Sequence, residues 1–381
     1  MRRFPVKRSL HLLQALSFYV FGGFVLTLGI ELGRAFRQKR LSLNVVGLSC
    51  ALILVMQVAS LFFVRPAFTT LTNFDFAEFA RWDLREIAPV LALLLLSLAR
   101  PKRAPAVVER QIIQVGAVVA LLGVAEYLCR AVLKWKISLG LVELDPSGFY
   151  FFRAWLDAHN AAGGLYLMIA TLAFYGVLQK KLHPLWFLLS LAGLMLTGSR
   201  TAAVSFVLVA LLIMAFLFLK RPKRVLIVAV ALAVALALSS GIIAARLSSL
   251  LAGAADYNTL SRLALWKQAW NAFVLSPIVG VGWGNYGFYS PNVQFGGWST
   301  HAHNSFLQVL AEGGIVGFTL YAWLFGLLGY ALYRRKVYGA LAAFGAVLIS
   351  SLYEHNLGAP TVAIPLFYLI GVHLFARTPH A

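Results

Sequence analysis

Residues 201–219 read TAAVSFVLVALLIMAFLFL, an uncharged apolar run between Arg200 and Lys220. A hydrophobic stretch of about 20 residues can cross the hydrocarbon core of a bilayer as an α-helix. Similar runs recur along the chain, and the eleven candidates are 10–30, 43–64, 82–99, 112–130, 161–179, 185–197, 201–219, 225–243, 313–333, 338–354 and 361–376. They predict an all-α fold: a polytopic transmembrane helical bundle of about 11 spans, within the range of about 10–12. One membrane domain then accounts for residues 1–381.

Composition agrees with a membrane protein. The 381 residues are 61% hydrophobic and 12% charged, and the mean hydropathy is +0.81. A soluble domain carries about a quarter of its residues as charged ones, so this chain cannot cover itself with a water-facing surface. Its two cysteines, Cys50 and Cys129, lie in apolar runs and cannot build a disulfide framework or a metal cage.

The net charge of +20 is carried by short clusters between the apolar runs. This pattern is typical of cytoplasmic loops that face anionic lipid, and it argues against nucleic-acid binding. More than half of the Lys and Arg residues fall in one set of alternate short loops, which we therefore assign to the cytoplasm. The long segment 244–312 then faces outward, toward the periplasm or the cell exterior, and is expected to form short helices. The orientation of residues 1–42 stays open, because eleven spans would place the basic N-terminus outside.

The first candidate site is a tight turn, TGSRT at residues 197–201. Arg200 could merely extend to the lipid headgroups. A Gly-Ser turn that opens into a helix, however, offers backbone N–H groups beside a guanidinium, which suits a phosphate.

Two further stretches lie in the outer segment. Residues 261–270, SRLALWKQAW, predict an amphipathic helix on which Arg262 and Trp266 share a face. An interfacial anchor explains the tryptophans but not Arg262. Residues 277–287, PIVGVGWGNYG, predict a tightly folded loop, for which a plain turn is a better explanation than phosphate binding.

The stretch HAHNSFLQVLAEGG at residues 301–314 leads into the next span. As a helix it would align Asn304, Gln308 and Glu312 in a polar stripe, and the glycine pair would end or kink it. Polar residues at membrane depth are costly and usually functional. A neutral imidazole there, His303 above all, is the natural general base for a hydroxyl.

A metal site made of His301, His303 and Glu312 is the competing interpretation. His-x-His on one helix points the two rings about 200° apart, so both reach one ion only if they precede the helix. We therefore expect neither a metal nor another cofactor. In the second outer loop, FYFFRAWLDAHN at residues 149–160 is mainly an aromatic belt, and Arg153 is its candidate substrate-binding residue.

In this order, the motifs resemble the superfamily of O-antigen ligases and O-antigen polymerases. The matching stretches are Gly-Ser-Arg at 198–200, Arg-Leu-Ala-Leu-Trp at 262–266, SPIVGVGWGN at 276–285, and HAHNS at 301–305 with Glu312-Gly313. The resemblance is specific over residues 197–317, which we expect to form the catalytic region.

The resemblance implies a multi-pass protein of the bacterial inner membrane with its active site on the periplasmic face. Its members transfer a glycan from undecaprenyl diphosphate to an acceptor hydroxyl, and lipid A–core is the acceptor of a ligase in lipopolysaccharide biosynthesis. Carried over to this chain, His303 is the catalytic base, and Arg200 and Arg262 bind the diphosphate. His301, Asn304 and Glu312 support or line the site.

Elementary chemistry agrees with these roles. Two guanidinium groups can stabilise the diphosphate as it leaves, a base takes the proton of the hydroxyl, and attack opposite the leaving group inverts the anomeric centre. The alternative within the class is a Wzy-type polymerase that extends one lipid-linked glycan with another. The rival from another class is a transporter of lipid-linked glycans, which would place charges in mid-span.

Overall fold

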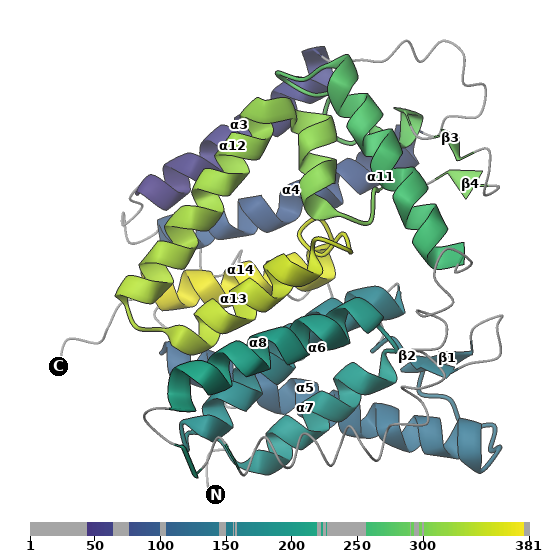
Figure 1. Ribbon diagram of the computed structural model, residues 1–381, viewed down its shortest axis with the longest axis vertical. Helices are drawn as coiled ribbons and strands as arrows, with labels where there is room; N and C mark the ends of the chain where they lie inside the picture. The colour runs from purple at the N-terminus through teal and green to yellow at the C-terminus, as the bar shows by residue number, and fades with distance from the viewer. Residues whose placement is uncertain are drawn as a thin grey trace, which may run out of the picture.

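The computed structural model describes residues 44–63, 76–99, 104–144, 150–154, 156, 158–218, 222, 223, 226, 257–289, 291, 292, 297, 298 and 301–376 (Figure 1). These residues are mostly helical, as predicted. The α-helices are α3 Val45–Phe63, α4 Phe76–Ala99, α5 Pro105–Tyr127, α6 His159–Leu178, α7 Pro184–Leu196, α8 Arg200–Phe218, α11 Tyr257–Leu275, α12 Ser305–Arg334, α13 Tyr338–Ser350 and α14 Pro360–Phe375.

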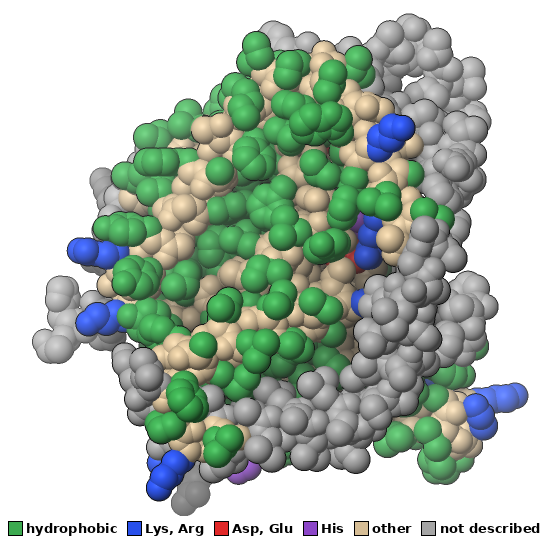
Figure 2. All heavy atoms as spheres, viewed as in Figure 1, with side chains coloured by type: hydrophobic (Ala, Val, Ile, Leu, Met, Phe, Trp, Pro, Cys, Tyr) green, Lys and Arg blue, Asp and Glu red, His purple; other side chains and the backbone are tan. Residues whose placement is uncertain are grey.

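Each apolar run that lies within the described residues coincides with a helix. The runs at 10–30 and 225–243 lie outside them, apart from Leu226, and so do residues 1–42 with their open orientation. Among the described residues, four segments are long and apolar enough to cross a membrane: Pro105–Val132, His159–Leu178, Arg200–Phe218 and Ser305–Arg334. Apolar side chains also cover much of the face in Figure 2, as contact with lipid requires. The chain is therefore a helical membrane protein, while the count of about 11 spans and its sidedness stay predictions.

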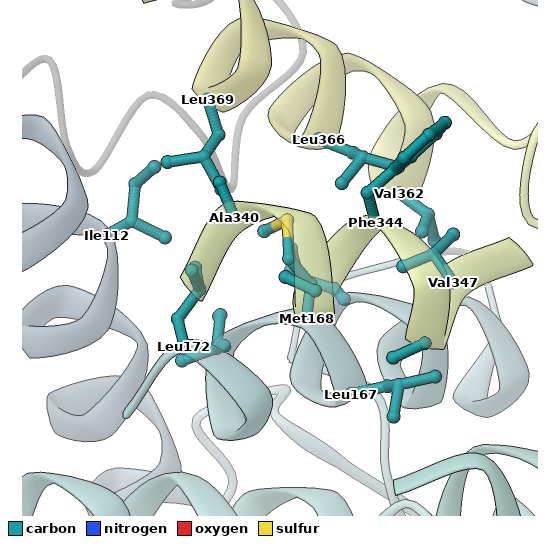
Figure 3. Packing of buried hydrophobic residues seen from close by; sticks show 14 of the residues in the cluster. Ile112, Leu167, Met168, Leu172, Ala340, Phe344, Val347, Val362, Leu366 and Leu369 are labelled. Atoms are coloured by element: carbon teal, nitrogen blue, oxygen red, sulfur yellow. The ribbon is translucent and has the colours of Figure 1, made fainter. Parts of the chain in front are cut away.

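Helix α6 lies at the centre of the bundle, where it packs against α7, α8, α13 and α14. Every residue from Ala162 to Phe174 is buried. A helix that is apolar on all sides is stable only when it is surrounded by other elements, which explains its place. Figure 3 shows this packing, in which side chains of α6 face those of α13, namely Leu167, Met168 and Leu172 toward Ala340, Phe344 and Val347.

Short irregular elements complete the described chain. Strand β1 (Val142–Leu144) pairs antiparallel with β2 (Tyr150–Phe152) after a π-helical turn, η2 (Leu128–Val132). In the segment expected to form short helices, α11 is followed by a 3-10 turn, η4 (Tyr286–Tyr289). The antiparallel pair of β3 (Pro291–Asn292) and β4 (Gly297–Trp298) then follows. These two small hairpins were not predicted, because each strand is too short to show an alternating pattern.

Helix α12 breaks at the glycine pair, as predicted. Gly314 has φ 60° and ψ −161°, which no helix contains. The loop at 277–282 fills the break with four backbone hydrogen bonds: Val281 N–H to Ala311 O at 2.9 Å, Gly282 N–H to Glu312 O at 3.0 Å, Ile315 N–H to Pro277 O at 2.9 Å and Val316 N–H to Ile278 O at 3.1 Å. Backbone groups freed in a membrane helix must find such partners. The Gly-rich loop therefore binds to the break in α12 through its backbone. This role agrees with the prediction of a plain turn rather than a phosphate-binding loop.

Candidate active site

His303 lies in the loop that precedes α12, and its backbone is in the left-handed region with φ 48°. The expectation that His301 and His303 belong to the helix is wrong, because the helix begins at Ser305. Asn304 is the physical reason: its side-chain oxygen accepts hydrogen bonds from the N–H groups of Phe306 and Leu307, both at 3.0 Å. A short polar side chain in this position is a strong helix N-cap. The predicted supporting residue Asn304 thus ends the loop and orients it.

Glu354 is the partner of His303. Its Oε2 atom lies 3.2 Å from Nδ1 of His303, and its Oε1 atom accepts a hydrogen bond from Nη2 of Arg262. The carboxylate is buried, with a side chain only 5% exposed, whereas His303 and Arg262 are 30% and 24% exposed. One carboxylate therefore holds both the predicted base and a predicted diphosphate-binding residue. In Figure 2 acidic, basic and histidine side chains lie together at one place, toward the right of a face that is mostly covered by apolar side chains.

Glu354 was not among the residues predicted from the sequence. It stands at the end of the apolar run predicted for 338–354, and in the structure it lies in the turn that follows α13. The available signal was Glu354-His355-Asn356, three polar residues in the short connection between two apolar runs. Polar and ionisable residues at such a place are a reason to expect a functional site.

The turn after α13 is tied to the start of α12. Ser305 donates its N–H to the carbonyl of Ser351 at 2.9 Å. Its hydroxyl donates to the carbonyl of Glu354 at 3.1 Å and accepts from the N–H of Leu357 at 3.3 Å. These bonds fix the backbone of Glu354 beside the loop that carries His303, so their contact is preorganised.

Helix α11 presents Arg262 to this turn. Tyr286 donates its hydroxyl to the carbonyl of Leu265 at 2.9 Å, which holds α11 against the Gly-rich loop. One helical turn beyond Arg262, the ring of Trp266 lies 5.6 Å from that of Tyr353. One contact with the Gly-rich loop and one with the turn after α13 therefore position α11, which carries Arg262.

Glu312 is more buried than the cluster of His303, Glu354 and Arg262, and it supports the site through hydrogen bonds. It is fully buried, and its Oε1 atom accepts from the N–H of Tyr286 at 3.1 Å and from Nε2 of Gln308 at 2.9 Å. The side-chain oxygen of Gln308 accepts in turn from the N–H of Ala302, at 2.8 Å. Gln308 and Glu312, two residues of the polar stripe predicted on α12, therefore join the loop that carries His301 and His303 to the Gly-rich segment that ends at Tyr286 and Gly287.

His301 lies between two other imidazoles. Its ring centroid is 4.6 Å from that of His303 and 5.1 Å from that of His355, on which it stacks at 18°. Burial, together with His355 and His303, holds the pKa of His301 well below its ordinary value of 6.5. His301 and His303 do precede the helix, as a shared metal would need. Within the described part of the chain, however, no group of three or more His, Cys, Asp or Glu side chains is arranged to hold an ion.

Arg200 begins α8 after a turn in which Gly198 has φ 64°. Two adjacent glycines of α6 bring this turn close to the one after α13. A Cβ atom added to Gly163 would lie 2.5 Å from Cβ of Ser199, and one added to Gly164 would lie 2.5 Å from Oδ1 of Asn356. Small residues allow this close approach. The Arg200 turn and the Glu354 turn therefore flank the same end of α6.

Arg153 stands apart from these contacts. It forms an ion pair with Glu143 at 2.9 Å across the β1–β2 hairpin, and the two side chains are 36% and 56% exposed. Strand β2 packs against α6 and α7. The hairpin therefore positions Arg153, whereas α11, α12 and the turn after α13 form the His303–Glu354–Arg262 cluster.

The cluster has the parts of a base-assisted reaction. If the Nδ1–H group of His303 donates a hydrogen bond to Glu354, Nε2 carries a lone pair with which it can accept a proton. Activated nucleophiles in enzymes commonly have this arrangement, in which a third group, such as a carboxylate, orients the imidazole that acts as the base. The guanidinium of Arg262 has five N–H donors, so contact with Glu354 through Nη2 leaves it other donors for an anion.

Residues 185–322 match the family model Wzy_C, described as O-antigen ligase. No curated protein matches the chain. The match includes Arg200, Arg262 and His303, so it confirms the resemblance seen in the sequence and supports a membrane glycan transferase of the ligase or polymerase type.

Proposed function

Because residues 185–322 match the family model described as O-antigen ligase, we propose that this chain transfers a glycan from undecaprenyl diphosphate to an acceptor hydroxyl. The acceptor is lipid A–core, and the reaction takes place on the periplasmic face of the bacterial inner membrane. The observation that carries the proposal is the buried carboxylate of Glu354, which contacts both His303 and Arg262.

In the proposed reaction, His303 is the catalytic base. Glu354 holds Nδ1, and Nε2 takes the proton from the acceptor hydroxyl. The hydroxyl oxygen attacks the anomeric carbon of the donor sugar, and the bond from this carbon to the diphosphate oxygen breaks. The leaving diphosphate keeps the electron pair of the broken bond. Attack on the face opposite the leaving group inverts the anomeric centre.

Arg262 and Arg200 stabilise the negative charge that develops on the leaving group. A planar guanidinium binds phosphate oxygens through two parallel hydrogen bonds, and such bonds are strong when donors and charge are held in place. With the diphosphate stabilised in this way, the reaction needs no general acid. It also needs no metal ion, because the two arginines supply the positive charge.

The test is transfer by purified protein in detergent, with an undecaprenyl-diphosphate glycan as donor, lipid A–core as acceptor, and EDTA. His303→Ala is the inactive variant, and His183→Ala is its matched control, since His183 only caps the start of α7. We expect wild type and His183→Ala to glycosylate the acceptor and His303→Ala to fold but lose transfer.

Other outcomes contradict parts of the proposal. Longer lipid-linked chains without a glycosylated acceptor would identify a polymerase. Activity that EDTA abolishes and a divalent ion restores would contradict the metal-independent mechanism. No product from folded wild type with several donors and acceptors would favour the transporter.

A further inference from the structure

An aromatic pair stands directly beside the candidate active site. Tyr353 precedes Glu354 in the turn after α13, and Trp266 follows Arg262 by one turn of α11. Their ring centroids are 5.6 Å apart at an interplanar angle of 51°. Tyr353 is 50% exposed, whereas Trp266 is partly buried, so the tryptophan supports a tyrosine ring that remains accessible.

The contact between Trp266 and Tyr353 joins the same two elements as the ion pair between Arg262 and Glu354. Arg262 contacts Glu354, and four residues further along α11 Trp266 contacts Tyr353. Both contacts join α11 to the same turn, and the two α11 residues that make them lie one helical turn apart. The position of Tyr353 is thus set by the elements that set the position of Arg262 and Glu354.

A membrane-interface belt does not explain this arrangement. Trp270, on the same helix, has the features expected of a belt residue, because it is 53% exposed. Among the described residues its ring pairs with Phe273 of its own helix, at 5.3 Å between centroids. Trp266 instead contacts a residue that lies beside Glu354. An accessible aromatic ring fixed next to charged groups is typical of a ligand site that combines an apolar surface with a few polar contacts.

We propose that Tyr353, supported by Trp266, binds the sugar ring that is attached to the diphosphate of the donor. This inference rests on the proposed function. A pyranose carries C–H groups on one face, which pack against an aromatic ring, and its hydroxyl groups suit the phenol oxygen of Tyr353. The diphosphate at Arg262 and the attacking hydroxyl at His303 both bond to the first sugar, so this sugar must lie between them. Tyr353 is adjacent in the chain to Glu354, the residue that contacts both side chains.

The experiment separates binding of the sugar from binding of the lipid diphosphate. The KM of the glycan donor and inhibition by sugar-free undecaprenyl diphosphate are measured for wild type, Tyr353→Ala, Tyr353→Phe and Trp270→Leu. We expect Tyr353→Ala to raise the donor KM about tenfold, the effect of an aromatic contact of about 1.4 kcal/mol. Inhibition by undecaprenyl diphosphate should stay unchanged, because this molecule carries no sugar.

The other variants are matched controls. Tyr353→Phe keeps the ring and should raise the donor KM by less than Tyr353→Ala does, and Trp270→Leu should behave as wild type. An unchanged donor KM in Tyr353→Ala would overturn the inference, as would an equal weakening of inhibition by undecaprenyl diphosphate. A rise confined to the KM of the acceptor would also overturn it. Failure of the proposed function looks different, since wild type itself would then form no product.

Discussion

Nδ1 of His303 lies 3.2 Å from Oε2 of Glu354, although 51 residues separate them in the chain. The other oxygen of the same carboxylate binds Arg262, 92 residues before Glu354. Helix α11, the loop before α12 and the turn after α13 thus meet at one buried carboxylate. This arrangement assigns to Glu354 the task of orienting the proposed base and one of the two proposed diphosphate-binding arginines.

Replacement of Glu354 tests this positioning role. Glu354→Gln keeps the shape of the side chain but removes the charge that orients His303, so we expect kcat to fall by about a hundredfold, within the range of general-base catalysis. Glu354→Asp should restore part of the loss. Steady-state kinetics on purified variants measures both, with Glu143→Gln as the control because Glu143 pairs with Arg153 outside the cluster. Wild-type kcat in Glu354→Gln would remove Glu354 from the mechanism.

A double-mutant cycle separates the two contacts of Arg262. Lysine carries the charge but not the planar fork, so we expect Arg262→Lys to lose at least about tenfold in kcat/KM. If Arg262 also binds the diphosphate, this loss persists in the Glu354→Gln background. The ion pair is already absent there, so any further loss must come from another contact of Arg262. Should Arg262→Lys cost nothing further in the Glu354→Gln background, Arg262 acts through Glu354 alone.

The break in α12 predicts a stability difference between two glycines of one helix. A Cβ atom at Gly314 would lie 2.4 Å from the carbonyl oxygen of Ile278, and φ there is +60°, whereas a Cβ atom at Gly326 meets nothing within 4 Å. We expect Gly314→Ala to lose at least about 2 kcal/mol of unfolding free energy, and Gly326→Ala less than about 0.5 kcal/mol. Thermal unfolding of both variants in detergent measures this. Equal unfolding temperatures would mean that the contact with the Gly-rich loop does not stabilise the helix.

The low pKa of His301 predicts a dependence of stability on pH. Its pKa in the folded chain is well below the 6.5 of an unfolded histidine, because of burial and of the neighbouring His355 and His303. As pH falls below 6.5, the unfolded state takes up a proton that the folded state resists. The stabilising contribution is therefore complete above this pH and is lost as the pH falls toward the pKa of the folded state.

Unfolding temperatures at about pH 7.5 and about pH 5.5 check this expectation for wild type and His301→Gln. Wild type should lose more stability between the two conditions, because glutamine does not titrate. Identical losses in both proteins would show that His301 contributes nothing to the pH dependence.

Local patterns were enough to predict the helices. The apolar runs coincide with helices wherever the structure describes them, because burial or lipid contact on all sides requires continuous apolar sequence. The glycine pair at 313–314 predicted the break in α12 for a similarly local reason, the absence of a side chain. The order of short motifs predicted the family, since each motif is a contiguous stretch of chain.

Tertiary structure alone decided what these residues do to one another. Glu354 had no local signature beyond the short polar connection to which it belongs, and its pairing with His303 and Arg262 depends on how α11, α12 and α13 pack. Likewise, Glu312 was predicted to support or line the site, and only packing makes it a buried acceptor for Tyr286 and Gln308. Periodicity in a sequence reflects which face of an element is buried, whereas contacts between distant side chains arise only when several elements pack together.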